Sequence, residues 1–156
     1  MPDETTHLPA GTSLRRTVRM AARLNAPPAR VSRAWSDPEE LARWFPDRVD
    51  GALAVGARTV LVWQDQRVWW DVLEATAGER FSFRWPWGPD ELLVTTVEVT
   101  FGHAGYGTAL ELEDGPFPLD QPGGVDAWAE AIQGWSEALA MLRAYVDFSV
   151  DLRERP

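Results

Sequence analysis

Cysteine is absent from the 156 residues of the chain, which excludes disulfide bonds, thiolate catalysis and zinc sites with cysteine ligands. Long apolar runs are also absent, because no stretch approaches the roughly 18 residues that a membrane helix needs. Residues 1–11 are polar and have the features of neither a signal peptide nor a transit peptide. These absences predict a cytoplasmic protein that does not insert into membranes.

Positive charge and histidine are scarce. The chain has 15 basic and 24 acidic residues, a net charge of -9. A protein that binds a phosphate backbone needs a basic face, so nucleic acid is not an expected partner. The two histidines are His7, in a tail, and His103, in an expected turn, and no metal-ligand or triad spacing accompanies them. We therefore assign no catalytic residue and no metal ligand, and we expect no cofactor.

Hydrophobic residues, by contrast, are plentiful. They make up 45% of the chain, which also contains nine tryptophans, and this is enough to build a folded core. Because single domains usually hold about 100–200 residues, the length predicts one domain. We expect that domain to span residues 13–150, with tails at 1–12 and 151–156.

The order of apolar and polar residues predicts a meander of strands. Residues 14–24 alternate in a way typical of a strand with one buried face. Asn25 and the prolines after it predict the start of a first short helix, and Asp37 with Pro38 predicts a second. Turn-forming residues separate a weak strand at 47–54 from stronger strands at 58–63, 67–75, 80–85, 92–101 and 108–114. This spacing is typical of an antiparallel sheet.

The last long segment, 125–148, has no internal proline and predicts a helix. Its apolar stripe consists of Trp128, Ile132, Trp135, Leu139, Leu142 and Val146. Strand alternation places Phe81, Phe83 and Trp85 together on one face of the sheet, which needs a cover. The sequence therefore predicts an α+β fold with a curved antiparallel sheet, two short helices and a long C-terminal helix.

Three stretches resemble motifs of a known superfamily. They are Ala26-Pro-Pro-Ala-Arg-Val31 followed by Trp35-Ser-Asp-Pro-Glu-Glu-Leu-Ala-Arg-Trp-Phe45, then Gly105-Tyr-Gly-Thr108, and finally Gly134-Trp-Ser-Glu-Ala-Leu-Ala-Met-Leu-Arg-Ala-Tyr-Val146. They are similar to the opening segment, the last hairpin and the C-terminal helix of START-like (SRPBCC) domains. The closest resemblance is to the branch named after the activator of the heat-shock-protein-90 ATPase, as found in single-domain bacterial proteins. It implies the helix-grip fold, which birch-pollen allergens share.

Members of that superfamily typically enclose a hydrophobic cavity, so the resemblance implies a ligand-binding site without naming the ligand. Our first hypothesis is the binding of a hydrophobic or lipid-like small molecule between the sheet and the long helix. The expected walls are Trp63, Phe83, Trp85, Val97, Trp128, Ile132 and Trp135, with Trp44 and Phe45 at the entrance. Alternatively, these large side chains simply fill the core.

Polar residues inside the grip are a further clue. The strand at 67–75 carries one acid on each face, Asp71 and Glu74. The inward acid would have a raised pKa and could act as a general acid or base. Asp71 or Arg84 would then supply a polar end to the cavity. The alternative is an acid on the rim or surface, paired with an arginine.

Two hypotheses from other classes remain. A protein-interaction or chaperone-cofactor module would have a filled core and an exposed apolar patch around Trp87 and one of Trp69 and Trp70, because neighbours on a strand face opposite ways. Such a module implies a protein partner, and START-like domains often pair, so a homodimer is a further hypothesis. A cyclase-like or aromatase-like enzyme would use Asp71, Glu74 or a tyrosine. Since no spacing supports a catalytic dyad, we do not favour the enzyme.

Overall fold

The computed structural model describes residues 14–153. Its strands are β1 (Arg15–Leu24), β2 (Arg48–Asp50), β3 (Arg58–Trp63), β4 (Gln66–Thr76), β5 (Arg80–Trp87), β6 (Leu93–Ala104) and β7 (Gly107–Pro118). The helices are α1 (Pro28–Ser36), α2 (Pro38–Leu41) and α3 (Gly124–Phe148). The strands form one antiparallel sheet in the order β1-β7-β6-β5-β4-β3-β2. The predicted α+β fold is confirmed.

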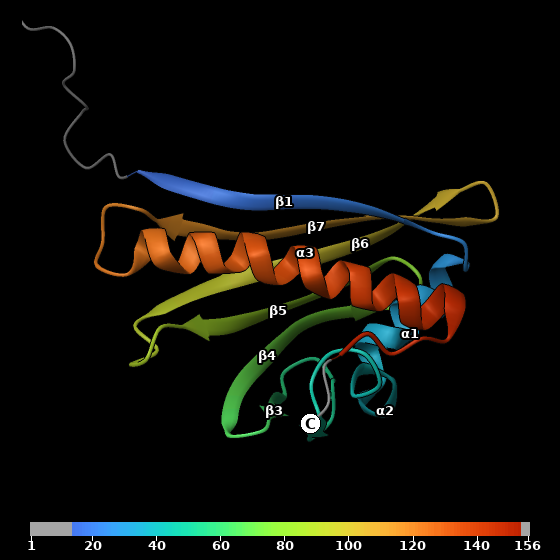
Figure 1. Cartoon of the computed structure of the whole chain (residues 1–156), viewed down its shortest axis with the longest axis horizontal. Helices are drawn as coiled ribbons and strands as arrows, with labels where there is room; N and C mark the ends of the chain where they lie inside the picture. The colour runs from blue at the N-terminus through green and yellow to red at the C-terminus, as the bar shows by residue number, and fades with distance from the viewer. Residues whose placement is uncertain (1–13, 154–156) are drawn as a thin grey trace, which may run out of the picture.

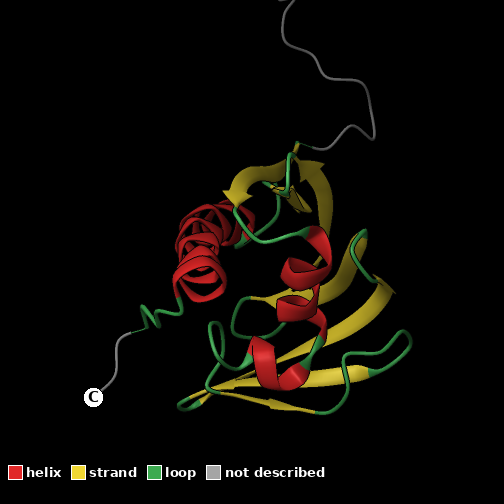
Figure 2. Ribbon diagram, turned by 90° about the vertical axis from the view of Figure 1, so that its right-hand side faces the viewer, coloured by secondary structure: helices red, strands yellow, loops and turns green. Residues whose placement is uncertain are grey.

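The long helix covers only part of the curved sheet. Figure 1 shows α3 lying across β7 and β6 and alongside β1, while β4 and β3 continue below it. From the side, the sheet curves around the short helices α1 and α2 (Figure 2). No helix among residues 14–153 is long and apolar enough to cross a membrane. The contacts of α3 with the sheet are therefore concentrated on β1 and β7.

The start of α2 follows the predicted cap, but the start of α1 does not. The Asp37 carboxylate accepts the backbone N–H groups of Glu39 and Glu40 at 2.9 and 3.3 Å, as expected of a helix N-cap. In contrast, α1 begins after Pro27 without any side-chain cap. The backbone N–H of Asn25 instead donates to the Asp147 carboxylate of α3 at 2.8 Å. The predicted cap at Asn25 is wrong, and this residue ties β1 to α3.

The last two strands are longer than predicted. The last strand was predicted to end at residue 114, but Gly115–Pro118 continues β7. Gly115 and Pro116 together lie opposite Thr17 alone in the register of β1 and β7. Such a bulge accommodates a proline, which has no N–H to give to the ladder. At the other end β6 reaches Ala104, so His103 lies in a strand and not in the turn.

The buried face of α3 shares Trp135, Leu139 and Leu142 with the predicted stripe but not Trp128 and Ile132. Ala127, Ala131, Trp135, Ala138 and Leu142 are buried against the sheet. The small side chains of Ala127, Ala131 and Ala138 allow the helix to approach β1 and β7 closely, which turns neighbouring positions outward. The side chain of Ile132 is therefore 39% exposed, and Trp128 is only half-buried.

One glycine shows how closely β1 and β7 approach each other. A Cβ atom at Gly107 would lie 2.3 Å from the carbonyl oxygen of Leu24, whereas one at Gly102 would meet nothing closer than 3.5 Å. We expect Gly107→Ala to lower the free energy of unfolding by about 1–3 kcal/mol through this backbone clash. Gly102→Ala, in the neighbouring strand, should cost less than about 1 kcal/mol. Urea denaturation measures both, and equal losses would contradict the close approach.

Candidate ligand-binding groove

The space beneath α3 is filled by aromatic rings. Trp70 stacks on Phe83 with ring centroids 3.7 Å apart, and Trp135 packs against Trp85 at 5.2 Å. Phe83 and Val97 are fully buried, and Trp135 and Trp44 are 1% exposed. Four of the residues predicted to line a cavity or its entrance are thus core residues, because large side chains from opposite faces fill the space between them.

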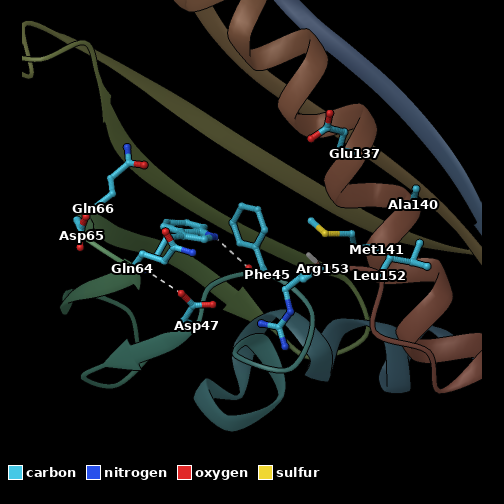
Figure 3. Close-up of a pocket in the computed structure, with 11 residues that line it drawn as sticks. Phe45, Asp47, Gln64, Asp65, Gln66, Glu137, Ala140, Met141, Leu152 and Arg153 are labelled. Carbon is cyan, nitrogen blue, oxygen red and sulfur yellow. Dashed lines mark hydrogen bonds between the residues drawn. The ribbon is translucent and has the colours of Figure 1, made fainter. Parts of the chain in front are cut away.

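Two hollows nevertheless lie beside this core, between α3 and the β3–β4 hairpin. Their volumes are about 800 and about 770 Å³. Phe45, Trp63 and Gln66 line both hollows, so we treat them as one feature and call it the helix–hairpin groove. Figure 3 shows one half, with Glu137, Ala140 and Met141 of α3 facing the hairpin residues. The other half is lined by Trp85, Trp87, Glu130 and Gly134.

The aromatic floor of the groove is held in place by its surroundings. Trp63 is the last residue of β3, and its indole N–H donates to the carbonyl of Phe45 at 3.0 Å. The two rings meet edge to face with centroids 5.0 Å apart. On its other side Phe45 stacks on the buried Trp135 at 5.7 Å. The floor is therefore preformed, because each ring is fixed by a neighbour that is itself packed.

A buried carboxylate lies behind the floor. Asp114 of β7 has no exposed surface. It accepts the indole N–H of Trp135 at 2.8 Å and the hydroxyl of Thr95. Thr95 in turn accepts the indole N–H of Trp87 at 2.8 Å. These contacts connect α3, β6, β7 and the end of β5, and they orient two of the rings beside the groove.

Burial governs the proton affinity of this carboxylate. Loss of hydration raises the pKa of Asp114 from 3.8 to about 6, although hydrogen bonds from Thr95 and Trp135 oppose the rise. The indole of Trp85 points toward the carboxylate and also favours ionisation, but its N–H falls short of a full hydrogen bond. Because Asp114 has no exposed surface, it cannot touch a molecule in the groove. Its role is to position Trp135 and its neighbours.

Sequence reasoning missed Asp114, although a signal for it was present. Leu110, Leu112 and Asp114 share one face of β7, and the two leucines are fully buried. The same alternation places Thr95 inward on β6, between Leu93 and Val97. If the period-two alternation of these strands is continued through the polar residues, it predicts that the Asp114 side chain lies in the core.

The acids and the arginine predicted for the cavity lie elsewhere. Asp71 is on the outer face of the sheet, where both its oxygens bind the Arg58 guanidinium at 2.7 and 2.9 Å. Arg84 is the exposed cross-strand neighbour of Asp71, so neither residue supplies a polar end. Glu74 follows a bulge in β4 and accepts the hydroxyl of Thr76 at the surface. The bulge changes its face, because an extra residue breaks the period of two.

Of the remaining residues predicted for the cavity, some line the groove and others lie at the surface. Trp63, Trp85 and Phe45 line the helix–hairpin groove, whereas Trp128 and Ile132 lie beyond its helix side. Within residues 14–153, no group of three or more histidine, aspartate or glutamate residues could hold a metal ion. His7 lies outside the described residues.

Comparison with known proteins identifies the family. Residues 25–147 match the family described as Activator of Hsp90 ATPase homolog 1-like protein. The chain belongs to this family. No curated protein matches it. As an activator-like chain, it carries the predicted helix-grip architecture over nearly all of the described residues.

Solved structures share the fold of this activator-like chain. Protein MLL2253 of Mesorhizobium loti has 25% identity and a TM-score of 0.72, with 82% of this chain and 94% of that chain covered. DynU16, described as a putative protein in the dynemicin biosynthetic locus, has 25% identity and a TM-score of 0.74, with 88% and 49% covered. The Aha1 dimer of Colwellia psychrerythraea has 13% identity and a TM-score of 0.74, with 85% and 97% covered.

The raised pKa of Asp114 predicts a distinctive dependence of stability on pH. The pKa is about 6 in the folded protein and 3.8 as the ordinary value, so the unfolded chain loses this proton at lower pH. Asp114 therefore contributes about 3 kcal/mol to the free energy of unfolding below about pH 4, and this contribution is lost as the pH rises through about 6. We expect Asp114→Asn to remove this decline, because the amide oxygen still accepts from Trp135 without ionising. Urea denaturation across this pH range measures the effect.

Asp71→Asn is the matched control. Hydrogen bonding to the Arg58 guanidinium lowers the pKa of Asp71, so this ion pair stabilises the wild type above the ordinary pKa and is lost as the pH falls. Asp71→Asn should therefore change the dependence of the free energy of unfolding on pH in the direction opposite to the change caused by Asp114→Asn. An Asp114→Asn profile parallel to the wild-type profile would contradict the assignment.

Proposed function

We propose that this chain binds a hydrophobic small molecule in the helix–hairpin groove. The observation that carries the proposal is the preformed aromatic floor of Phe45 and Trp63, which lies beside the buried aromatic core. Ligand pockets in proteins usually measure about 300–1,000 Å³ and have apolar walls with a few polar groups. Each half of the groove falls in this range, at about 800 and about 770 Å³.

The arrangement favours binding because few side chains of the groove have to be ordered when a ligand binds. Trp63 is fixed by its hydrogen bond to the Phe45 carbonyl, and Phe45 is fixed by Trp135. A ligand that packs against these rings therefore does not have to immobilise them, and a preorganised site loses less entropy on binding. The partly exposed ring of Trp63, backed by the buried Phe45, suits a planar, largely apolar molecule.

The relatives support a small-molecule role. DynU16 shares 25% identity and is described as a putative protein in the dynemicin biosynthetic locus. A protein from a biosynthetic locus is consistent with a role in handling a biosynthetic compound. The buried Asp114 has no exposed surface, so the proposal is binding and not catalysis.

A variant that fills the groove tests the proposal. Gly134 lines the groove from α3, and a Cβ atom there would meet nothing within 4 Å. We expect Gly134→Phe to lower the affinity for a neutral planar dye, Nile red, by at least about tenfold, because the new ring occupies the space of the ligand. The fold should survive, since replacing a helical glycine favours the helix. Dye fluorescence titration measures the affinity, and circular dichroism confirms the helix.

Gln133→Phe is the matched control. It adds the same ring one position away, on an exposed part of α3 outside the groove lining. It should leave the affinity for Nile red unchanged. Equal affinity in Gly134→Phe and the wild type would overturn the proposed site, as would equal loss in both variants.

An interaction module is the second candidate, and it has its own supporting observation. The apolar patch expected around Trp69, Trp70 and Trp87 is not available: Trp70 is buried, the guanidinium of Arg58 covers Trp69 at 4.1 Å, and Trp87 packs on Phe117 at 5.5 Å. Instead, Phe148, Val150 and Leu152 are exposed by 61, 45 and 54% at the end of α3. This C-terminal strip could contact a second copy or another protein.

Native mass spectrometry separates the two candidates. If the strip is a dimer interface, the purified protein should be dimeric and Phe148→Ser with Val150→Ser should make it monomeric, because both changes remove apolar contact area. A monomeric wild type would contradict the dimer. A small-molecule mass that disappears on denaturation would instead support the groove.

A further inference from the structure

Carboxylates line both halves of the helix–hairpin groove. Glu130 and Glu137 lie on the α3 side, and Asp47 and Asp65 lie on the hairpin side. Figure 3 shows Glu137 across the groove from Asp47 and Asp65. These acids stand above the aromatic floor, so the groove has an apolar base and an acidic rim.

These carboxylates have no positive partner within residues 14–153. Asp47 accepts the backbone N–H of Gln64 at 2.8 Å, and Glu137 has only a long contact of 3.4 Å with the Gln133 amide. Among the described residues no ion pair involves Asp47, Asp65, Glu130 or Glu137. Two arginines also line the groove, and both are engaged. Arg153 donates to the Asp151 carboxylate and to two backbone carbonyls, and Arg67 faces Asp50 at 3.6 Å.

Acids on the outer face of the sheet do form ion pairs with arginines. There Asp71 binds Arg58 at 2.7 Å and Glu113 binds Arg19 at 2.9 Å. Some acids of the outer face are thus neutralised, although Glu111 there has no ion pair among the described residues, whereas none of the four groove acids named above has one. With a net charge of -9, the whole molecule adds a field that attracts positive ligands.

We propose that the ligand of the groove is an organic cation, an apolar planar group that carries a protonated amine. The apolar part would pack on Trp63, beside Phe45, while the ammonium group lies between the acidic walls. Both parts of the site favour such a molecule, because aromatic faces attract cations and unpaired carboxylates gain from a positive neighbour. This inference rests on the proposed function and specifies the chemical class of the ligand.

A matched series of probes tests which charge on the ligand the groove prefers. The probes are 2-naphthylmethylammonium, the neutral 2-naphthalenemethanol and the anionic 2-naphthoate, which share one ring system. We expect the ammonium probe to bind about tenfold more tightly than the alcohol at low ionic strength, and the carboxylate to bind most weakly. The preference should shrink as salt is added, because both walls are open to solvent. Isothermal titration calorimetry measures all three affinities.

The variant Asp65→Asn with Glu137→Gln locates the effect. It should reduce the affinity for the ammonium probe about tenfold and leave the affinity for the alcohol unchanged. Glu98→Gln with Glu113→Gln removes the same charge from the outer face and should leave both affinities unchanged. An equal effect of the two double variants would overturn the assignment to the groove.

The outcomes distinguish this inference from the proposed function. If the alcohol binds as tightly as the ammonium probe and Gly134→Phe blocks both, the groove is a ligand site and the inferred charge is wrong. If no probe binds, or if Gly134→Phe leaves binding intact, both the charge and the groove are wrong. Tighter binding of the carboxylate would overturn the inference directly.

Discussion

The hydrogen bond between the Trp135 indole and the buried Asp114 carboxylate, 2.8 Å long, is the contact around which the rest of the structure is arranged. It joins α3 to β7 and, through Thr95 and Trp87, to β6 and β5. A carboxylate loses much hydration free energy when it is buried, so it needs donors from several elements at once. That requirement fixes the rotation of α3, the direction of the Trp135 ring and hence the Phe45 ring that stacks on it.

The rotation of α3 explains why the groove is at the side and not beneath the helix. With Ala131 and Ala138 against the sheet, α3 lies close to β1 and β7, and the rings of Trp70, Phe83 and Trp135 fill what remains. Space remains where the sheet curves away, at the β3–β4 hairpin. The activator-like fold therefore holds a filled core and an accessible aromatic surface side by side. The unpaired acids gather along that surface.

Much of this architecture could be predicted from the sequence, and the reasons are local. Period-two alternation reveals a half-buried strand, and Asp37 before Pro38 reveals a cap, because each depends on neighbouring residues alone. The candidate site could be predicted only in part. Trp63 and Trp85 were predicted as walls and Phe45 at the entrance, and all three line the groove. Phe83 and Trp135 are core, however, and the bulge after Val72 carries Glu74 to the surface. Ring rotamers, helix rotation and bulges depend on contacts between distant segments, which no local pattern specifies. Asp114 was within reach of the alternation rule and was missed because the strand was taken to end there.

The division between filled core and lateral groove has a consequence for how such a chain can diverge. Gln64, Asp65 and Gln66 form the tip of a hairpin, and Glu137 and Ala140 lie on an exposed part of α3. None of these side chains contributes to the buried aromatic cluster. These positions of the groove are thus separate from those of the buried core, so they can change, through insertions or exchanged charges, while the core is retained. A fold organised in this way can supply many different specificities from one unchanged interior.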